Sequence, residues 1–184
     1  MKKAGWNAAA GAVTLVLGLC VLANHLYVIP SVDKPTSSDV LFVLAPSYDR
    51  ISLAENMMET GFAETLVVSS PTSSESGRPA ICDEKLKYKV ICFSPEPITT
   101  RGEARALRTL SQEYGWDTAS VITARFHVSR ARLIFQRCFA GDLNIIAIDT
   151  TMPVLSLQDP KRTWLYHFAY ETGAFAKAAI DPTC

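Results

Sequence analysis

The sequence predicts an α/β domain with a mostly parallel sheet, preceded by one N-terminal transmembrane helix. Three observations lead to this prediction. A long uncharged apolar stretch follows Lys2 and Lys3. After it, short runs rich in Val, Ile and Leu alternate with segments of helical periodicity, and such alternation is typical of a parallel sheet covered by helices on both faces. The 184 residues suffice for one domain with a sizeable core.

The first 30 residues carry the transmembrane prediction. After Lys2 and Lys3 no Asp, Glu, Lys or Arg occurs until Asp33, and residues 8–29 supply about the 20 residues that cross a bilayer. The two lysines keep the N-terminus in the cytoplasm by the positive-inside rule. We therefore expect residues 1–30 to form a cytoplasmic N-terminus and a signal-anchor in the cell membrane, with the rest of the chain extracytoplasmic.

Three alternatives to an anchor fit this stretch less well. Residues 21–23 (Val-Leu-Ala) fit a signal-peptide cleavage site, but the apolar stretch is longer than the usual cleaved segment. A lipoprotein signal has a small residue before its cysteine, whereas Leu19 precedes Cys20 here. A buried core helix is the least favoured alternative, because of the position of the stretch at the N-terminus and the lysine pair before it. Trp6 and Tyr27 stand near the two ends of the stretch, where amphipathic rings prefer the interface.

The elements after the anchor follow in order from hydrophobic periodicity. Residues 31–38 (SVDKPTSS) are polar and read as a linker to a domain over 39–184. The continuous apolar run at 39–45 predicts a strand buried on both faces, and a helix over 50–60 follows it and ends at Gly61. The same patterns predict the remaining elements, namely strands at 65–69, 89–93, 119–123 and 143–148, and helices at 100–114, 128–139 and 164–180.

Four cysteines lie beyond the anchor. An even number in an oxidising compartment permits two disulfides, with three possible connectivities, and four free thiols are the alternative. Cys82 and Cys92 flank a short charged stretch that can form a closed loop, while a bridge from Cys138 to Cys184 would hold the end of the chain. No CxxC motif occurs, so we expect no metal site.

Charge balance bears on the partners. Lys and Arg number 18, as do Asp and Glu. Nucleic-acid binding calls for a basic patch or stripe, so we expect no nucleic-acid partner. The sequence identifies no cofactor.

The predicted sheet brings four turns to one edge. In parallel α/β sheets, ligands bind outside the carboxyl ends of the strands, where we expect residues 46–50, 69–71, 96–103 and 124–130 to meet. The candidate site residues in these turns are Arg50, Ser69, Glu96, Thr100, His127 and Arg130.

These residue types suit acid–base chemistry on an anionic ligand. The nearby cations Arg125 and Arg130 favour a neutral His127, which can act as a base, and Glu96 is the free carboxylate at this edge. Arg50 and Arg130 can hold phosphate or carboxylate groups. The alternative is a surface histidine with solvated arginines.

Thr100 and Glu103 fit two roles. Thr-x-x-Glu is a capping box, which favours a structural role, yet the same helix N-terminus suits an anion, and both roles can hold together. A Ser69–His127 hydrolase pair is not favoured, because no Gly-x-Ser-x-Gly elbow occurs.

Four segments carry a resemblance to a known family: DVLFVLAPSYDR, LVVSS, EPITTRGEA and VITARFHVSRARLIF. Over about residues 39–149 the chain resembles the YdcF/SanA/ElyC-like family of bacterial envelope proteins. The matching residues are Asp39, Arg50, Ser69, Glu96, Thr99, Thr100, Glu103, Thr123, His127, Arg130 and Ala131. Ala45-Pro46 and Ser70 stand where the family usually has glycines, so a glycine-lined phosphate cradle is not expected at these two turns.

The resemblance implies a Rossmann-like three-layer fold and adds Thr99, Glu103 and Thr123 to the expected ligand-binding residues. It also implies a role in cell-envelope or cell-wall biogenesis, on peptidoglycan or lipid-linked saccharide precursors. Two function classes remain open. The domain is either an enzyme acting on a phosphorylated or lipid-linked saccharide, or a non-catalytic binding or scaffold protein for cell-wall synthesis machinery.

Overall fold

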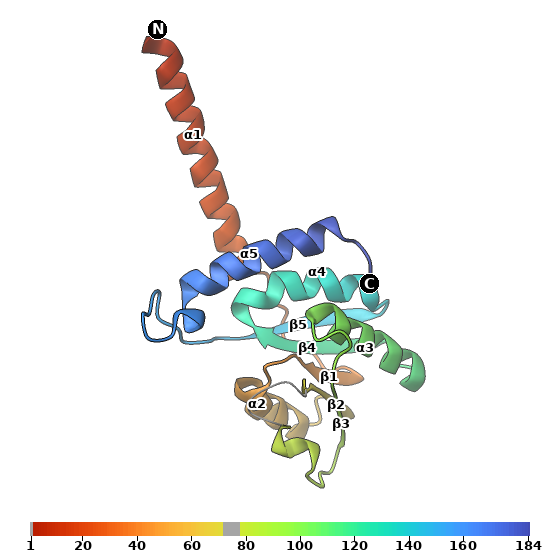
Figure 1. Cartoon of the computed structure of the whole chain (residues 1–184). Helices are drawn as coiled ribbons and strands as arrows, with labels where there is room; N and C mark the ends of the chain where they lie inside the picture. Colours follow the sequence, from red (N-terminus) through yellow and green to blue (C-terminus); the bar gives the residue numbers. More distant parts are fainter. Residues whose placement is uncertain (1, 72–77) are drawn as a thin grey trace.

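The computed structural model describes residues 2–71 and 78–184, without the side chains of residues 2–10 and of Tyr48. The predicted interfacial role of the Trp6 ring therefore lies outside the described side chains. The N-terminal helix α1 (Lys2–Ala23) stands away from the domain (Figure 1) and continues into a π-helical turn η1 (Asn24–Val28). In the part of the chain described, it is the one helix long and apolar enough to cross a membrane.

The domain is built on a five-stranded sheet in which every pairing is parallel. The strand order is β3-β2-β1-β4-β5. The predicted α/β class and the Rossmann-like arrangement are therefore confirmed. The first strand is central and fully buried because it is apolar on both faces. The strands are β1 (Val40–Val43), β2 (Thr65–Ser69), β3 (Lys89–Phe93), β4 (Thr118–Ala124) and β5 (Asp142–Ile148).

Helices cover both faces of the sheet (Figure 1). Phe42 points into a core formed with α3 and α4, whereas Leu41 and Val43 point into a second core formed with α2 and η2. The last helix packs on α4 and forms an outer layer. The helices are α2 (Tyr48–Glu59), α3 (Thr100–Tyr114), α4 (Val128–Cys138) and α5 (Trp164–Ile180), with short 3₁₀ turns η2 (Ala80–Cys82), η3 (Arg125–His127) and η4 (Pro160–Arg162).

Two disulfides connect the four cysteines of the domain. Cys82 bonds to Cys92 with 5.7 Å between their Cα atoms, and Cys138 bonds to Cys184 with 4.9 Å. Both bridges join the pairs that the sequence favours. The first ties η2 to β3, and the second ties the end of the chain to the end of α4.

The predicted linker has fixed contacts with the domain. Within residues 31–38, the backbone N–H of Asp33 donates to the Ile145 carbonyl, and the Asp33 carboxylate accepts from the Ile145 N–H and from Arg132. The start of the segment therefore lies beside β5, and its end lies near the start of β2, where the Ser38 N–H donates to the Phe62 carbonyl.

The domain also contacts the end of the anchor directly. The Tyr27 ring, expected near the lipid–water interface, is only 3% exposed and packs edge-on against Phe168 of α5, so it contacts protein rather than lipid. The chain is thus buried in the domain four positions after α1 ends at Ala23.

Candidate functional site

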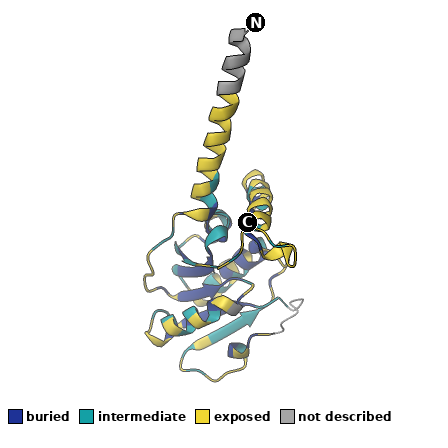
Figure 2. Cartoon of the chain, turned by 90° about the vertical axis from the view of Figure 1, so that its left-hand side faces the viewer, coloured by how far each residue is buried: buried dark blue, intermediate teal, exposed yellow. Residues whose placement is uncertain are grey.

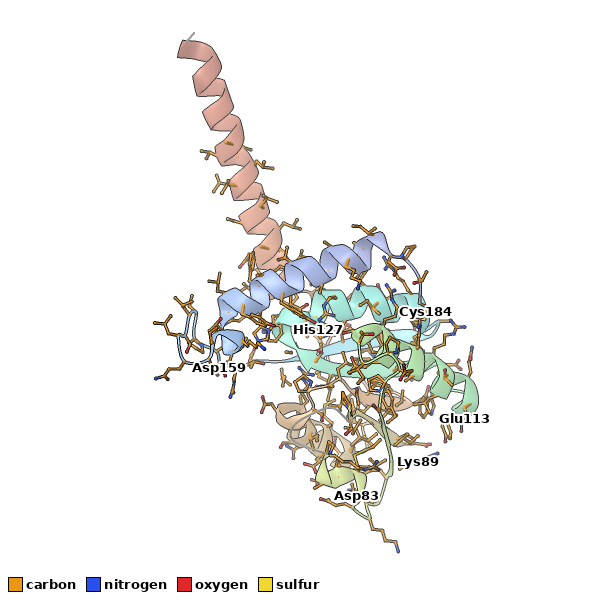
Figure 3. The ribbon with its side chains drawn as sticks, viewed as in Figure 1. Asp83, Lys89, Glu113, His127, Asp159 and Cys184 are labelled. Carbon is orange, nitrogen blue, oxygen red and sulfur yellow. A yellow bond between two sulfur atoms is a disulfide. The ribbon has the colours of Figure 1, made fainter. Side chains whose placement is uncertain are left out.

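A buried polar cluster lies at the carboxyl edge of the sheet, beside the gap between β1 and β4. After β1, the chain adds β2 and then β3 on one side of that strand, and β4 and β5 lie on its other side. Ligands of doubly wound sheets bind at this kind of switch point. Figure 3 labels His127 at this edge, beneath α5.

A paired arginine and glutamate form the centre of the cluster. Arg130 of α4 donates through Nε and one terminal nitrogen to the two carboxylate oxygens of Glu171 on α5, at 2.7 and 2.8 Å. Its other terminal nitrogen donates to Thr100 Oγ1 at 3.0 Å. Only 2% of the Glu171 side chain and 11% of the Arg130 side chain are exposed. Removing two charges from water costs free energy, and the two hydrogen bonds of the bidentate pair help to offset that cost.

His127 lies between Thr100 and Glu171. Its Nε2 is 3.3 Å from Thr100 Oγ1, and its Nδ1 is 3.6 Å from a Glu171 oxygen. Because Thr100 already accepts a hydrogen bond from Arg130, its own hydroxyl hydrogen is free to donate to Nε2. That arrangement leaves the proton of the neutral ring on Nδ1, facing the carboxylate.

Burial controls the charge state of these groups. It lowers the pKa of His127 to about 4, with the Arg130 charge adding to the effect and Glu171 opposing it. Burial raises the pKa of Glu171, but the hydrogen bonds from Arg130 and the nearby His127 outweigh it and lower that pKa to about 2. The imidazole is therefore neutral near pH 7, so that it is able to accept a proton, and the neighbouring carboxylate is ionised.

A second carboxylate, Glu103 of α3, faces the end of β1. It accepts the backbone N–H of Ala45 at 2.8 Å, and Arg50 donates to the Leu44 carbonyl at 2.7 Å. Burial raises the pKa of Glu103, while the Ala45 amide, the Ser69 hydroxyl and the arginines oppose it. Burial also lowers the pKa of Arg50 to about 10. Both side chains are almost fully buried and hold the β1–α2 turn.

The predicted capping box is wrong by one residue. Thr99 is the N-cap of α3, and its side chain accepts from the Gly102 N–H. Thr100 is instead the first helical residue, so its hydroxyl points into the cluster, and Glu103 reaches Ala45 rather than the cap. Neighbouring threonines are equally good caps, and only the extended backbone of Thr99 distinguishes them.

Three buried polar atoms have no hydrogen-bond partner within the described residues: Ser69 Oγ, Thr123 Oγ1 and His127 Nδ1. They come from the ends of β2 and β4 and from the turn after β4. The Ser69 hydroxyl lowers the pKa of the nearby Glu103 without reaching hydrogen-bonding geometry. Unsatisfied buried groups are rare and costly, and they often mark a site where a ligand or water binds.

No family model, curated protein or solved structure matches the chain.

The structure gathers most of the residues that the sequence predicts, and leaves two at the surface. Glu96 and Thr99 are exposed, and Glu96 makes no hydrogen bond or ion pair that the structure describes. The gathered residues are Arg50, Ser69, Thr100, Glu103, Thr123, His127 and Arg130, all but Arg130 with at most 9% exposed. They form a closed cluster rather than the open cleft we expected.

Sequence reasoning missed Glu171. It lies about 70 residues beyond Thr100 along the chain, outside the four turns and outside the segments that carry the family resemblance. One signal was available: between Trp164 and Ile180 the only Asp, Glu, Lys or Arg residues are Glu171 and Lys177. A single carboxylate in an otherwise apolar helix is unusual unless it is paired inside the protein.

Proposed function

We propose that the protein is a membrane-anchored extracytoplasmic enzyme of the cell envelope, which performs acid–base chemistry on a phosphorylated or lipid-linked saccharide. The resemblance to YdcF/SanA/ElyC-like envelope proteins supports the setting. The position of the cluster at the switch point of the sheet supports a ligand-binding role.

The Thr100–His127–Glu171 arrangement is the observation that carries the proposal. A neutral imidazole accepts a proton on Nε2, from the Thr100 hydroxyl or from a water or substrate hydroxyl that takes its place. Glu171 faces Nδ1, where it orients the ring and stabilises the imidazolium that forms. Glu171 thereby takes the carboxylate role that the sequence suggested for Glu96.

The same cluster supplies the positive charge for an anionic substrate. Arg130 presents three donor nitrogens at the N-terminus of α3, where a helix favours an anion. Glu171 occupies two of them and Thr100 the third, so an anionic group of the substrate would share the Arg130 guanidinium with these two side chains.

The anchor and the disulfides support an extracytoplasmic location. Helix α1 has the length and composition of a membrane span, and the two disulfides suit an oxidising compartment. Lys2 and Lys3 at its start put the domain outside by the positive-inside rule.

Turnover by the purified full-length protein tests the proposal. The probes are a polyprenyl phosphate and a polyprenyl diphosphate-linked sugar, and the readouts are binding by native mass spectrometry and product release. We expect His127→Gln to lose turnover 10²-fold or more, the usual share of a general base, while it keeps binding. His25→Gln, an exposed histidine outside the cluster, serves as the matched control and should behave as wild type. Equal turnover by wild type and His127→Gln would refute the assignment.

A non-catalytic binding or scaffold role is the second candidate. One observation favours it: Arg130 is already matched by Glu171, and the cluster is closed, which is typical of a structural ion pair. Binding of the probes without turnover by the wild-type protein would decide for this role.

A further inference from the structure

Helix α5 turns an apolar surface outward and its carboxylate inward. Leu165, Phe168, Tyr170 and Ile180 are 58, 43, 54 and 83% exposed, whereas Glu171 is 2% exposed. A surface helix of a soluble domain shows the opposite pattern, with apolar residues towards the core. A contiguous exposed apolar surface marks an interaction site.

The loop before α5 extends this surface. Val154, Leu155 and Leu157 are 74, 62 and 92% exposed. The loop is attached to the start of the helix, because the backbone N–H groups of Trp164 and Leu165 donate to the carbonyls of Pro153 and Val154. The apolar surface therefore comprises the outer face of α5 and residues 153–157.

The base of α1 lies against this surface. Tyr27, in the turn after α1, packs on Phe168 with 5.5 Å between ring centroids, and the Leu26 carbonyl accepts from Ser129. In Figure 1, α5 runs across the base of α1, and Figure 2 shows its exposed side at the same end of the domain. Strands β1 to β3 and helix α2 lie at the opposite end (Figure 1).

We propose that the outer face of α5 and residues 153–157 lie in the interfacial layer of the bilayer that α1 crosses. This inference rests on the proposed anchoring by α1. Residues 4–23 rise about 30 Å as an α-helix, which matches the hydrocarbon thickness. Tyr27 then lies roughly 6 Å further along the axis, within a headgroup layer that is about 5–7 Å deep on each side. Its partner Phe168 lies at the same depth.

Composition and position favour lipid over a protein partner. Tyr166, Phe168 and Tyr170 are aromatic side chains of the kind that gather at the lipid–water interface. Lys161, Arg162 and Lys177 are exposed at the two ends of the surface, where cations contact anionic headgroups. The short connection to α1 already holds this surface against the bilayer, so a protein partner would have to bind within the same interfacial layer.

This placement joins the membrane to the buried cluster. The helix that lies on the lipid is the one that inserts Glu171 between His127 and Arg130. The Tyr170 ring lies 5.9 Å from the Arg130 guanidinium carbon. Tyr170, which is 54% exposed, therefore links the outer face of α5 to Arg130 of the cluster.

Site-directed spin labelling of the full-length protein in vesicles of phosphatidylethanolamine and phosphatidylglycerol tests the inference. Cys20 is the one free cysteine that the structure describes, and a label on it reports the anchor. In a Cys20→Ala background, labels on Leu165→Cys and Leu157→Cys report the apolar surface. A label on Glu113→Cys, exposed at the far end of α3 (Figure 3), is the aqueous control. The readout is the ratio of oxygen to nickel-chelate collision rates.

We expect the labels on Leu165→Cys and Leu157→Cys to give ratios several-fold above the Glu113→Cys control and below that of Cys20. A lipid-exposed Cys20 label together with control-like ratios at both surface positions would overturn the inference while leaving the anchor intact. A control-like ratio at Cys20 itself would overturn the anchoring on which the inference rests. Protection of both surface labels from both reagents, increasing with protein concentration, would assign the surface to a second copy of the chain and also refute the proposal.

Discussion

At the scale of single residues, the Arg130–Glu171 pair dominates the cluster. Each carboxylate oxygen of Glu171 receives a nitrogen of Arg130 in a site with almost no exposure. Removing one member of such a pair leaves a buried charge without compensation, whereas removing both does not. The two members therefore have to be tested separately and together.

We predict that Glu171→Leu lowers the free energy of unfolding by about 3–5 kcal/mol, because it leaves Arg130 buried and unpaired. The double variant Arg130→Met/Glu171→Leu should recover most of this loss. Urea unfolding followed by circular dichroism measures both. Arg125→Gln breaks the more exposed pair with Asp149 and should cost much less. Equal losses in the single and double variants would contradict a direct pairing role.

His127 makes stability depend on pH. Its pKa falls from 6.5 to about 4 on folding, so between these values the unfolded chain binds a proton that the folded chain does not. Stability is therefore full above pH 6.5 and decreases as the pH falls towards 4. The contribution of His127 to this decrease is about 3 kcal/mol. Unfolding at pH 7 and pH 4.5 should show a smaller difference for His127→Gln than for wild type, and an unchanged difference would mean that another group is responsible.

At the scale of elements, the start of α3 positions the site. Gly102 lies so close to the turn before the helix that a Cβ there would overlap the Pro97 carbonyl oxygen. This close approach lets Thr99 cap the helix and turns Thr100 towards His127. The position of Thr100 in the cluster therefore depends on a glycine that has no polar side chain of its own.

We predict that Gly102→Ala destabilises the protein by about 1–3 kcal/mol, since the extra methyl group has no room. Gly173→Ala, at a helical glycine with nothing within 4 Å, should instead stabilise by about 1 kcal/mol through helix propensity. Thermal or urea unfolding of the two variants gives the comparison. A stabilising Gly102→Ala would show that the turn adjusts freely.

At the scale of the whole molecule, the short connection between α1 and the domain is the main feature. The predicted linker lies on the sheet, and the domain begins to pack at Tyr27. With α1 anchored in a membrane as proposed, this short connection would hold the domain close to the bilayer.

We predict that a reporter active only outside the cytoplasm, fused after Cys184, is active. In the same exported protein all four domain cysteines should be oxidised as Cys82–Cys92 and Cys138–Cys184, by non-reducing peptide mapping. A reporter that works only in the cytoplasm, fused at the same position, serves as the control and should be silent. Full activity of that control would reverse the topology. Release of a shortened soluble form would point to cleavage after Ala23.

Much of this molecule is determined by local sequence. The apolar runs and helical periodicities place β2, β3, α3 and α5 at the predicted residues, because each strand and helix face must be buried against the same sheet. A parallel sheet brings its turns to one edge, so the meeting of Ser69, Thr100, His127 and Arg130 also follows from the pattern.

Tertiary structure decided what no local pattern contains. Glu171 joins the site because α5 packs on α4, and Tyr27 is buried because its turn packs on η3 and α4 while Phe168 of α5 covers its ring. Thr99 and Thr100 are equally good caps by residue type, and only the backbone conformation determines that Thr99 caps α3. The physical reason is that the pairing of buried charges, the choice of the helix cap and the burial of the cluster depend on contacts between segments distant in sequence. The periodicity of strands and helices depends instead on neighbours along the chain.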